Sequence, residues 1–146
     1  MKTFRRFTVV PAALVISLAL TKPILAEVPS VQINPKLQSD PLILNGKSGG
    51  SIHSDCGNIP DAPSQIIQVK ESLPYLRLTV DSPGQPTLLI AGPGGRFCVL
   101  GDRYSQTKPE LSGYWQEGQY SLYVGELSKR QYNYTLSISQ QKKPMN

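Results

Sequence analysis

The 146-residue sequence contains few of the residues on which catalytic and metal sites depend. It has one histidine, one tryptophan and two cysteines. A single imidazole and one thiol pair provide few ligands for zinc, and the two cysteines are far from C-x-x-C spacing. We therefore predict no catalytic residues, no metal site and no cofactor.

Long apolar runs are scarce as well, and the longest lies at the N-terminus. Residues 7–20 form a mainly apolar run of about 14 residues, shorter than the roughly 20 that a membrane-spanning helix needs. Three basic residues precede the run and the small residue Ala26 closes the segment, as in a secretory signal peptide. We predict that residues 1–26 are a signal peptide and that the mature protein, starting at Glu27, is periplasmic or extracellular.

The charge of the chain depends on this segment. The whole chain has a formal charge of +5, but residues 1–26 hold four of its fifteen basic residues and none of its ten acidic ones. The exported part is therefore close to neutral. It lacks the basic surface that neutralises phosphates, so we exclude nucleic acid as a partner, and we expect no transmembrane segment after signal cleavage.

Cys56 and Cys98 both lie in the exported part. Disulfides form in oxidising compartments, so an isolated pair of cysteines there predicts one structural disulfide. Such a bond would close a loop of about 43 residues, which in the chain-entropy treatment stabilises a fold by about 4 kcal/mol. That is a large share of the stability of one small domain.

Proline and glycine divide the chain into short segments. Residues 27–41 contain three prolines among polar residues and no sustained periodicity, which predicts a flexible leader. Residues 42–139 carry the periodic pattern of a single domain. Residues 140–146 predict a disordered tail.

Apolar and polar residues alternate strictly in three segments, residues 75–80, 119–124 and 132–139. Alternation gives a strand one buried and one wet face, which is typical of antiparallel sheets. Further strands are predicted at residues 42–44, 65–70, 87–91 and 96–100, for a total of about seven. The sequence therefore predicts an all-β antiparallel sandwich, immunoglobulin-like or jelly-roll-like, with little helix.

Glycine-rich and proline-rich turns support this assignment. Gly92-Pro93-Gly94-Gly95 predicts a hairpin between two strands, and residues 82–86 predict a second connection of the same kind. Tyr120 begins a strand after a long connection. It is either a tyrosine corner, with its hydroxyl bonded to the backbone upstream, or a plain core residue.

The order of several motifs resembles the bacterial pre-peptidase C-terminal domain over residues 42–139. The motifs are Leu44-Asn45-Gly46, Asp55-Cys56-Gly57, Leu76-Arg77-Leu78-Thr79-Val80, Pro86-Thr87-Leu88-Leu89-Ile90, Gly92-Pro93-Gly94-Gly95, Phe97-Cys98, Gly113-Tyr114-Trp115, Gly118-Gln119-Tyr120 and Tyr123-Val124-Gly125.

The resemblance implies a jelly-roll-like sandwich without catalytic machinery, of a kind often appended to secreted peptidases and thought to help export, folding or surface attachment. The chain departs from the pattern at the paired acids that often follow the position of Cys98. Only Asp102 is present there, so a calcium role is not carried over.

The residue types of a hydrolase triad occur close together, because His53 lies beside Ser54 and Asp55. Triad geometry is set in space, and neighbours in a glycine-rich and serine-rich stretch do not predict it. A small secreted hydrolase or a hydrolase inhibitor is therefore only the alternative from another functional class.

The connection between Asp102 and Gln119 contains Tyr104, Tyr114 and Trp115, which are the candidate ligand-binding residues. Aromatic rings on a long loop suit carbohydrate or peptide recognition, whereas Trp115 could instead cap the core. We expect an exported, non-catalytic accessory or binding module. Its partner would be an unknown protein or glycan at the cell envelope.

Overall fold

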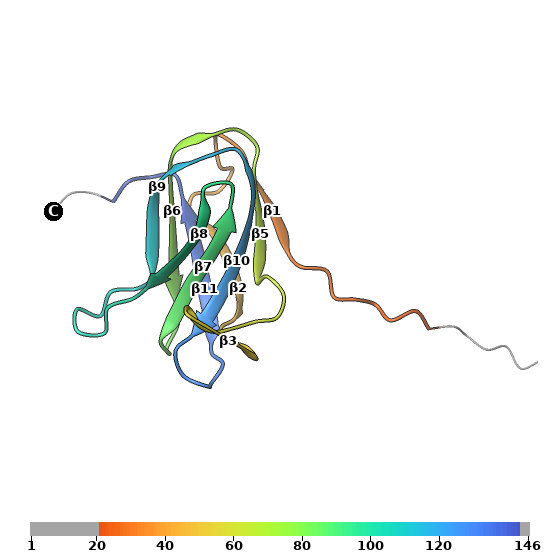
Figure 1. Ribbon diagram of the computed structural model, residues 1–146. Helices are drawn as coiled ribbons and strands as arrows, with labels where there is room; N and C mark the ends of the chain where they lie inside the picture. Colours follow the sequence, from red (N-terminus) through yellow and green to blue (C-terminus); the bar gives the residue numbers. More distant parts are fainter. Residues whose placement is uncertain (1–20, 144–146) are drawn as a thin grey trace, which may run out of the picture.

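The computed structural model describes residues 21–143, so residues 1–20 of the predicted signal peptide lie outside the described residues. The described part forms eleven strands and no helix (Figure 1), and therefore has no helix that could span a membrane. The predicted all-β sandwich is confirmed. The predicted strand number, about seven, was too low.

The strands form two sheets packed face to face. The seven-stranded sheet contains β1 (Ser30–Ile33), β3 (Ile52–Ser54), β4 (Gly57–Ile59), β5 (Gln65–Val69), β7 (Pro86–Gly92), β8 (Gly95–Leu100) and β10 (Gly118–Glu126). The four-stranded sheet has the order β2 (Leu42–Lys47), β11 (Asn133–Ser139), β6 (Leu73–Asp81) and β9 (Glu110–Trp115). All pairs are antiparallel except β1 with β5.

The core lies between the sheets and is built from the alternating residues that the sequence indicated. All seven predicted strands are present, and the largest difference in bounds is at β2, which continues to Lys47. The inward faces of β6, β10 and β11 are buried, at Leu76, Leu78, Val80, Tyr120, Leu122, Val124, Tyr134, Leu136 and Ile138. Each fully buried aliphatic side chain contributes about 2 kcal/mol of hydrophobic free energy.

The prediction of a flexible leader is wrong for residues 30–33. These residues form β1, which pairs in parallel with β5, and Ile33 is fully buried. Only two apolar residues, Val31 and Ile33, alternate in this strand, and such a short pattern between prolines gives little signal. The prediction of a disordered tail is wrong for Gln140, whose amide donates to Asp40 and whose side chain donates to the carbonyl of Asn34.

Only one of the two predicted turns joins strands that pair with each other. Gly92 pairs with Gly95, so the predicted hairpin between β7 and β8 is confirmed. The connection at residues 82–86 is not a hairpin, because it leads from β6 in one sheet to β7 in the other. The sequence does not distinguish this connection from a hairpin. Which sheet β6 and β7 join is decided by their pairing partners elsewhere in the chain.

Tyr120 forms a tyrosine corner, which is one of the two alternatives that the sequence left open. Its hydroxyl donates to the carbonyl of Gln116 at 2.8 Å, and its ring packs on Trp115 with a centroid distance of 4.6 Å. A side chain at Gly92 would meet the Tyr120 ring, because an added Cβ would lie 2.2 Å from the ring carbon Cδ1. The corner therefore ties the start of β10 to the end of β9 and to the β7–β8 turn.

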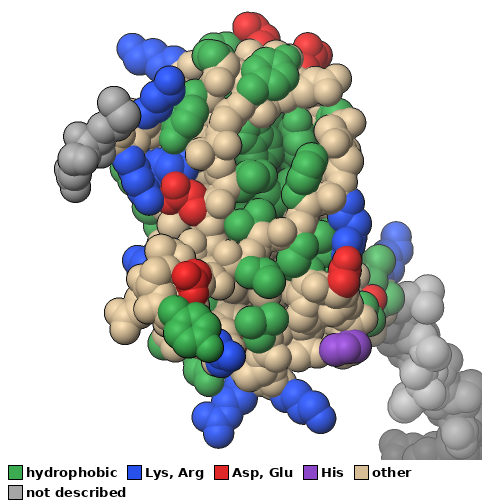
Figure 2. Space-filling view, turned by 60° about the vertical axis from the view of Figure 1, so that its left-hand side comes forward, with side chains coloured by type: hydrophobic (Ala, Val, Ile, Leu, Met, Phe, Trp, Pro, Cys, Tyr) green, Lys and Arg blue, Asp and Glu red, His purple; other side chains and the backbone are tan. Residues whose placement is uncertain are grey.

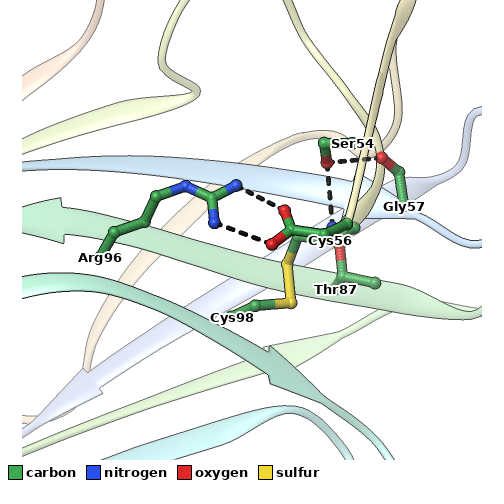
Figure 3. Close-up of a disulfide and its surroundings, with 7 residues drawn as sticks. Ser54, Cys56, Gly57, Thr87, Arg96 and Cys98 are labelled. Carbon is green, nitrogen blue, oxygen red and sulfur yellow. Dashed lines mark hydrogen bonds and ion pairs between the residues drawn. A yellow bond between two sulfur atoms is a disulfide. The ribbon is translucent and has the colours of Figure 1, made fainter.

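Cys56 and Cys98 form the predicted disulfide, with a Cα–Cα distance of 5.6 Å (Figure 3). The bond joins the turn between β3 and β4 to β8. Beside it, Arg96 donates to both carboxylate oxygens of Asp55, at 2.7 and 3.1 Å. The Thr87 hydroxyl donates to the buried carbonyl of Cys56 at 2.6 Å. These contacts hold the short β3–β4 hairpin against β7 and β8 of the same sheet.

Replacing Cys98 by serine should destabilise the oxidised protein by about 4 kcal/mol, because the unfolded chain regains the freedom of a loop of about 43 residues. Urea unfolding of residues 27–146 measures the change. Wild-type protein treated with a reductant is the matched control and should unfold at the same urea concentration as Cys98→Ser. Equal stability of the variant and the oxidised wild type would contradict a stabilising role for the disulfide.

Replacing Tyr120 by phenylalanine should lower the free energy of unfolding by about 1 kcal/mol, because the ring stays packed while one partly buried hydrogen bond is lost. Tyr114→Phe is the control, since the Tyr114 side chain is largely exposed. Urea unfolding compares the two variants. Similar stabilities would show that the Tyr120 hydroxyl does not contribute.

Candidate functional site

The loop between β8 and β9 projects from one end of the sandwich (Figure 1). We call residues 102–107 the tip loop. Its two ends are joined by backbone hydrogen bonds in both directions, at 3.1 Å from the Asp102 amide and 3.0 Å from the Thr107 amide. The ends of the loop are therefore held together by its own backbone.

The Asp102 carboxylate organises the inside of the tip loop. It accepts a hydrogen bond from the Ser105 hydroxyl at 2.7 Å and another from the Tyr104 amide at 2.9 Å. The Ser105 hydroxyl, followed by the Tyr104 amide, holds the pKa of Asp102 below its ordinary value of 3.8. The side chain of Tyr104 has a relative exposure of 101% and makes the outermost aromatic surface of the loop.

A cavity of about 680 Å³ opens between the tip loop, the β6–β7 connection and the end of β10. Lys108 and Asp81 form an ion pair at 2.7 Å on its wall. Glu126 also lines the cavity, although it is only 1% exposed. Its two carboxylate oxygens accept hydrogen bonds from the backbone amide of Gln85, at 2.9 and 3.0 Å. The Ser128 hydroxyl donates to the same carboxylate at 3.1 Å.

Glu126 was not predicted from the sequence. The only signal for it is an acid that ends the apolar alternation of β10, directly after Val124 and Gly125. Every hydrogen bond that it accepts comes from a neighbouring connection. Glu126 therefore positions the loops around the cavity.

The three predicted ligand-binding residues do not come together. Trp115 is 4% exposed and packs in the core, which is the alternative that the sequence left open. Tyr114 is 68% exposed but lies near the C-terminal end of β9, whereas the tip loop precedes the N-terminal end of that strand. The predicted long loop is thus interrupted by β9, and only Tyr104 remains on the tip loop.

The residue types of a hydrolase triad are close in sequence but are not assembled into one. His53 is exposed, and its Nδ1 lies 3.4 Å from the side-chain oxygen of Asn58. Asp55 is engaged by Arg96, which lowers the pKa of Asp55. Among residues 21–143, no three His, Cys, Asp or Glu side chains are grouped as metal ligands.

Comparison with known proteins gives one sequence relative and several structural ones. No family model matches the chain. It is 38% identical over 129 residues to an uncharacterized protein of Synechococcus elongatus, covering 85% of this chain and 92% of that protein. The pre-peptidase C-terminal domain of collagenase from Bacillus anthracis matches with a TM-score of 0.53 at 13% identity, over 77% of this chain and 95% of that domain. PliG of Aeromonas hydrophila, a periplasmic inhibitor of g-type lysozyme, matches with a TM-score of 0.46 at 14% identity, over 77% and 96%.

The order of the tip loop should depend on pH through Asp102. Because its pKa is lowered in the folded loop, the carboxylate stabilises the loop above pH 3.8 and that stabilisation is lost as pH falls through the lowered pKa. The Tyr104 amide resonance, followed by NMR from pH 6 to pH 2, should move with this titration. Asp102→Asn should abolish the transition. A Tyr104 amide that moves identically in the variant would contradict the role of Asp102.

Proposed function

Because this chain belongs to one family with the Synechococcus elongatus protein and has the fold of a pre-peptidase C-terminal domain, we propose that it is a non-catalytic binding module. We place its action outside the cytoplasm. The apolar N-terminal segment and the disulfide support export, since disulfides persist in oxidising compartments.

The tip loop is the proposed binding surface, and the exposure of Tyr104 is the observation that carries this assignment. A ring that is fully exposed has no role in the core of its own chain. It is also presented by a loop that its own hydrogen bonds hold in shape. A preordered loop loses little conformational entropy on binding, which favours affinity.

The proposed partner is a protein. Arg103 is exposed beside Tyr104, and tyrosine and arginine are enriched among the residues that dominate protein–protein binding energy. A glycan platform would need aromatic rings side by side. Tyr104 and Tyr114 are separated by the length of β9, and Trp115 is buried, so the aromatic residues favour a protein surface.

Replacing Tyr104 by alanine should weaken binding of the partner at least about tenfold, which corresponds to about 1.4 kcal/mol, without changing the unfolding midpoint. The partner is first isolated on immobilised residues 27–146 from periplasm and culture medium of the producing organism, and identified by mass spectrometry. Titration calorimetry then compares wild type and variant.

Tyr114→Ala is the matched control, because it removes another exposed tyrosine, near the far end of β9. It should bind like the wild type. Equal affinities of wild type and Tyr104→Ala would refute the tip loop as the binding surface. Retention of a glycan instead of a protein would refute the partner class, and turnover of the retained molecule would refute a non-catalytic role.

A further inference from the structure

Glu126 is a buried carboxylate whose charge is not neutralised by a basic side chain. It accepts hydrogen bonds from the backbone amides of Gln85 and Ser128 and from the Ser128 hydroxyl, and all of these donors are uncharged. None of the ion pairs formed within residues 21–143 includes it. Uncharged donors satisfy the oxygens but leave the net charge in place, and a buried charge is costly unless an opposite charge lies near it. A cationic ligand in the adjoining cavity would supply that charge.

The other charged side chains that line the cavity balance one another. Lys108 pairs with Asp81 at 2.7 Å. Asp102 and Arg103 carry opposite charges and are adjacent in the tip loop, where the Asp102 carboxylate is held by hydrogen bonds within the loop. The lining therefore contains two acidic and two basic side chains besides Glu126. The charge of Glu126 is the excess, and it makes the cavity negative.

This excess charge is not part of a broad acidic surface. Figure 2 shows the side of the molecule from which the tip loop projects, and acidic side chains are scattered over it among other types. A basic surface of a partner would gain little attraction from such a face. The walls of a cavity, in contrast, have a low dielectric constant and concentrate the field of a charge behind them. The arrangement therefore favours one basic side chain inside the cavity.

An aromatic ring adjoins the Glu126 carboxylate on the cavity wall. A Cβ added to Gly84 would lie 2.4 Å from Cδ2 of Tyr132 and 2.5 Å from Oε2 of Glu126, so the ring and the carboxylate are neighbours. Both residues line the cavity, whose volume of about 680 Å³ leaves room for a long side chain. The guanidinium group of arginine is planar, stacks on aromatic rings and is only weakly hydrated, unlike the ammonium group of lysine. A ring beside a buried carboxylate therefore favours arginine.

We propose that the cavity beside the tip loop binds an arginine side chain of the protein partner. The guanidinium group lies against the ring of Tyr132 and is attracted by the charge of Glu126, while Tyr104 contacts the surface of the partner around that arginine. The inference rests on the proposed function for the source of the arginine. The recognition itself depends only on the cavity, so a small arginine compound should bind there without the partner.

The probe is N-acetylarginine amide, in which only the side chain is charged. Titration into isotope-labelled residues 27–146 should give saturable NMR shifts of the Gln85 and Ser128 amides, which donate to Glu126. N-acetylcitrulline amide has the same shape without the charge and should bind at least about tenfold more weakly. N-acetyllysine amide should also bind more weakly than the arginine compound. Equal binding of the citrulline compound would overturn recognition of charge, and equal binding of the lysine compound would overturn the choice of arginine.

Variants of the protein locate the site. Glu126→Gln keeps the size of the side chain and removes its charge, so it should abolish the preference for arginine over citrulline. Glu117→Gln is the matched control, because it makes the same change at an exposed residue between β9 and β10, and it should bind like the wild type. Tyr132→Leu leaves Glu126 in place and should weaken binding of the arginine compound about threefold. It tests the same site if Glu126→Gln does not fold.

Tyr104→Ala separates the cavity from the tip loop. Tyr104 is not among the residues that line the cavity, so this variant should bind the arginine compound like the wild type while losing the partner. If the compound does not bind at about 50 mM, or shifts only amides away from the cavity, the inference is overturned, whatever Tyr104→Ala does to the partner. If the compound binds in the cavity but Tyr104→Ala retains the partner, the cavity is supported and the tip loop is refuted.

Discussion

Burial of the inward face of β10 is the constraint on which the rest of the structure depends. This strand pairs with β5 and then β4 along one edge and with β7 along the other, while its inward residues pack on the smaller sheet. Its two ends carry the strongest local anchors. Tyr120 binds the backbone before the strand, and Glu126 holds the connections after it. The same strand therefore positions the core and the cavity beside the tip loop.

The sequence was most informative where burial repeats over several residues. Leu76, Leu78 and Val80 alternate with polar neighbours, and β6 has the predicted inward face. The sequence was least informative where one long-range contact decides the structure. Val31 and Ile33 become a strand only because β5 lies beside them, and β9 interrupts a segment whose aromatic residues suggested a loop.

The candidate site could be predicted only in part, because it too depends on long-range contacts that the sequence does not reveal. An exposed and a buried aromatic residue look alike in a sequence, and only packing against Tyr120 separates Trp115 from Tyr104. The disulfide was predictable because the sequence contains a single pair of cysteines, both after an N-terminal segment that predicts export. Glu126 was not, since its partners lie in connections whose positions depend on the fold.

The tip loop is also a mechanical junction. It continues directly into an edge strand of each sheet, so a partner that holds Tyr104 pulls on both sheets at once. On the β8 side, the Cys56–Cys98 bond links the strand covalently to the β3–β4 hairpin, whereas β9 is held by noncovalent contacts, its pairing with β6 and the burial of Trp115 among them. The two strands that flank the loop therefore differ in the kind of attachment, since one is cross-linked to another part of the fold and the other is not.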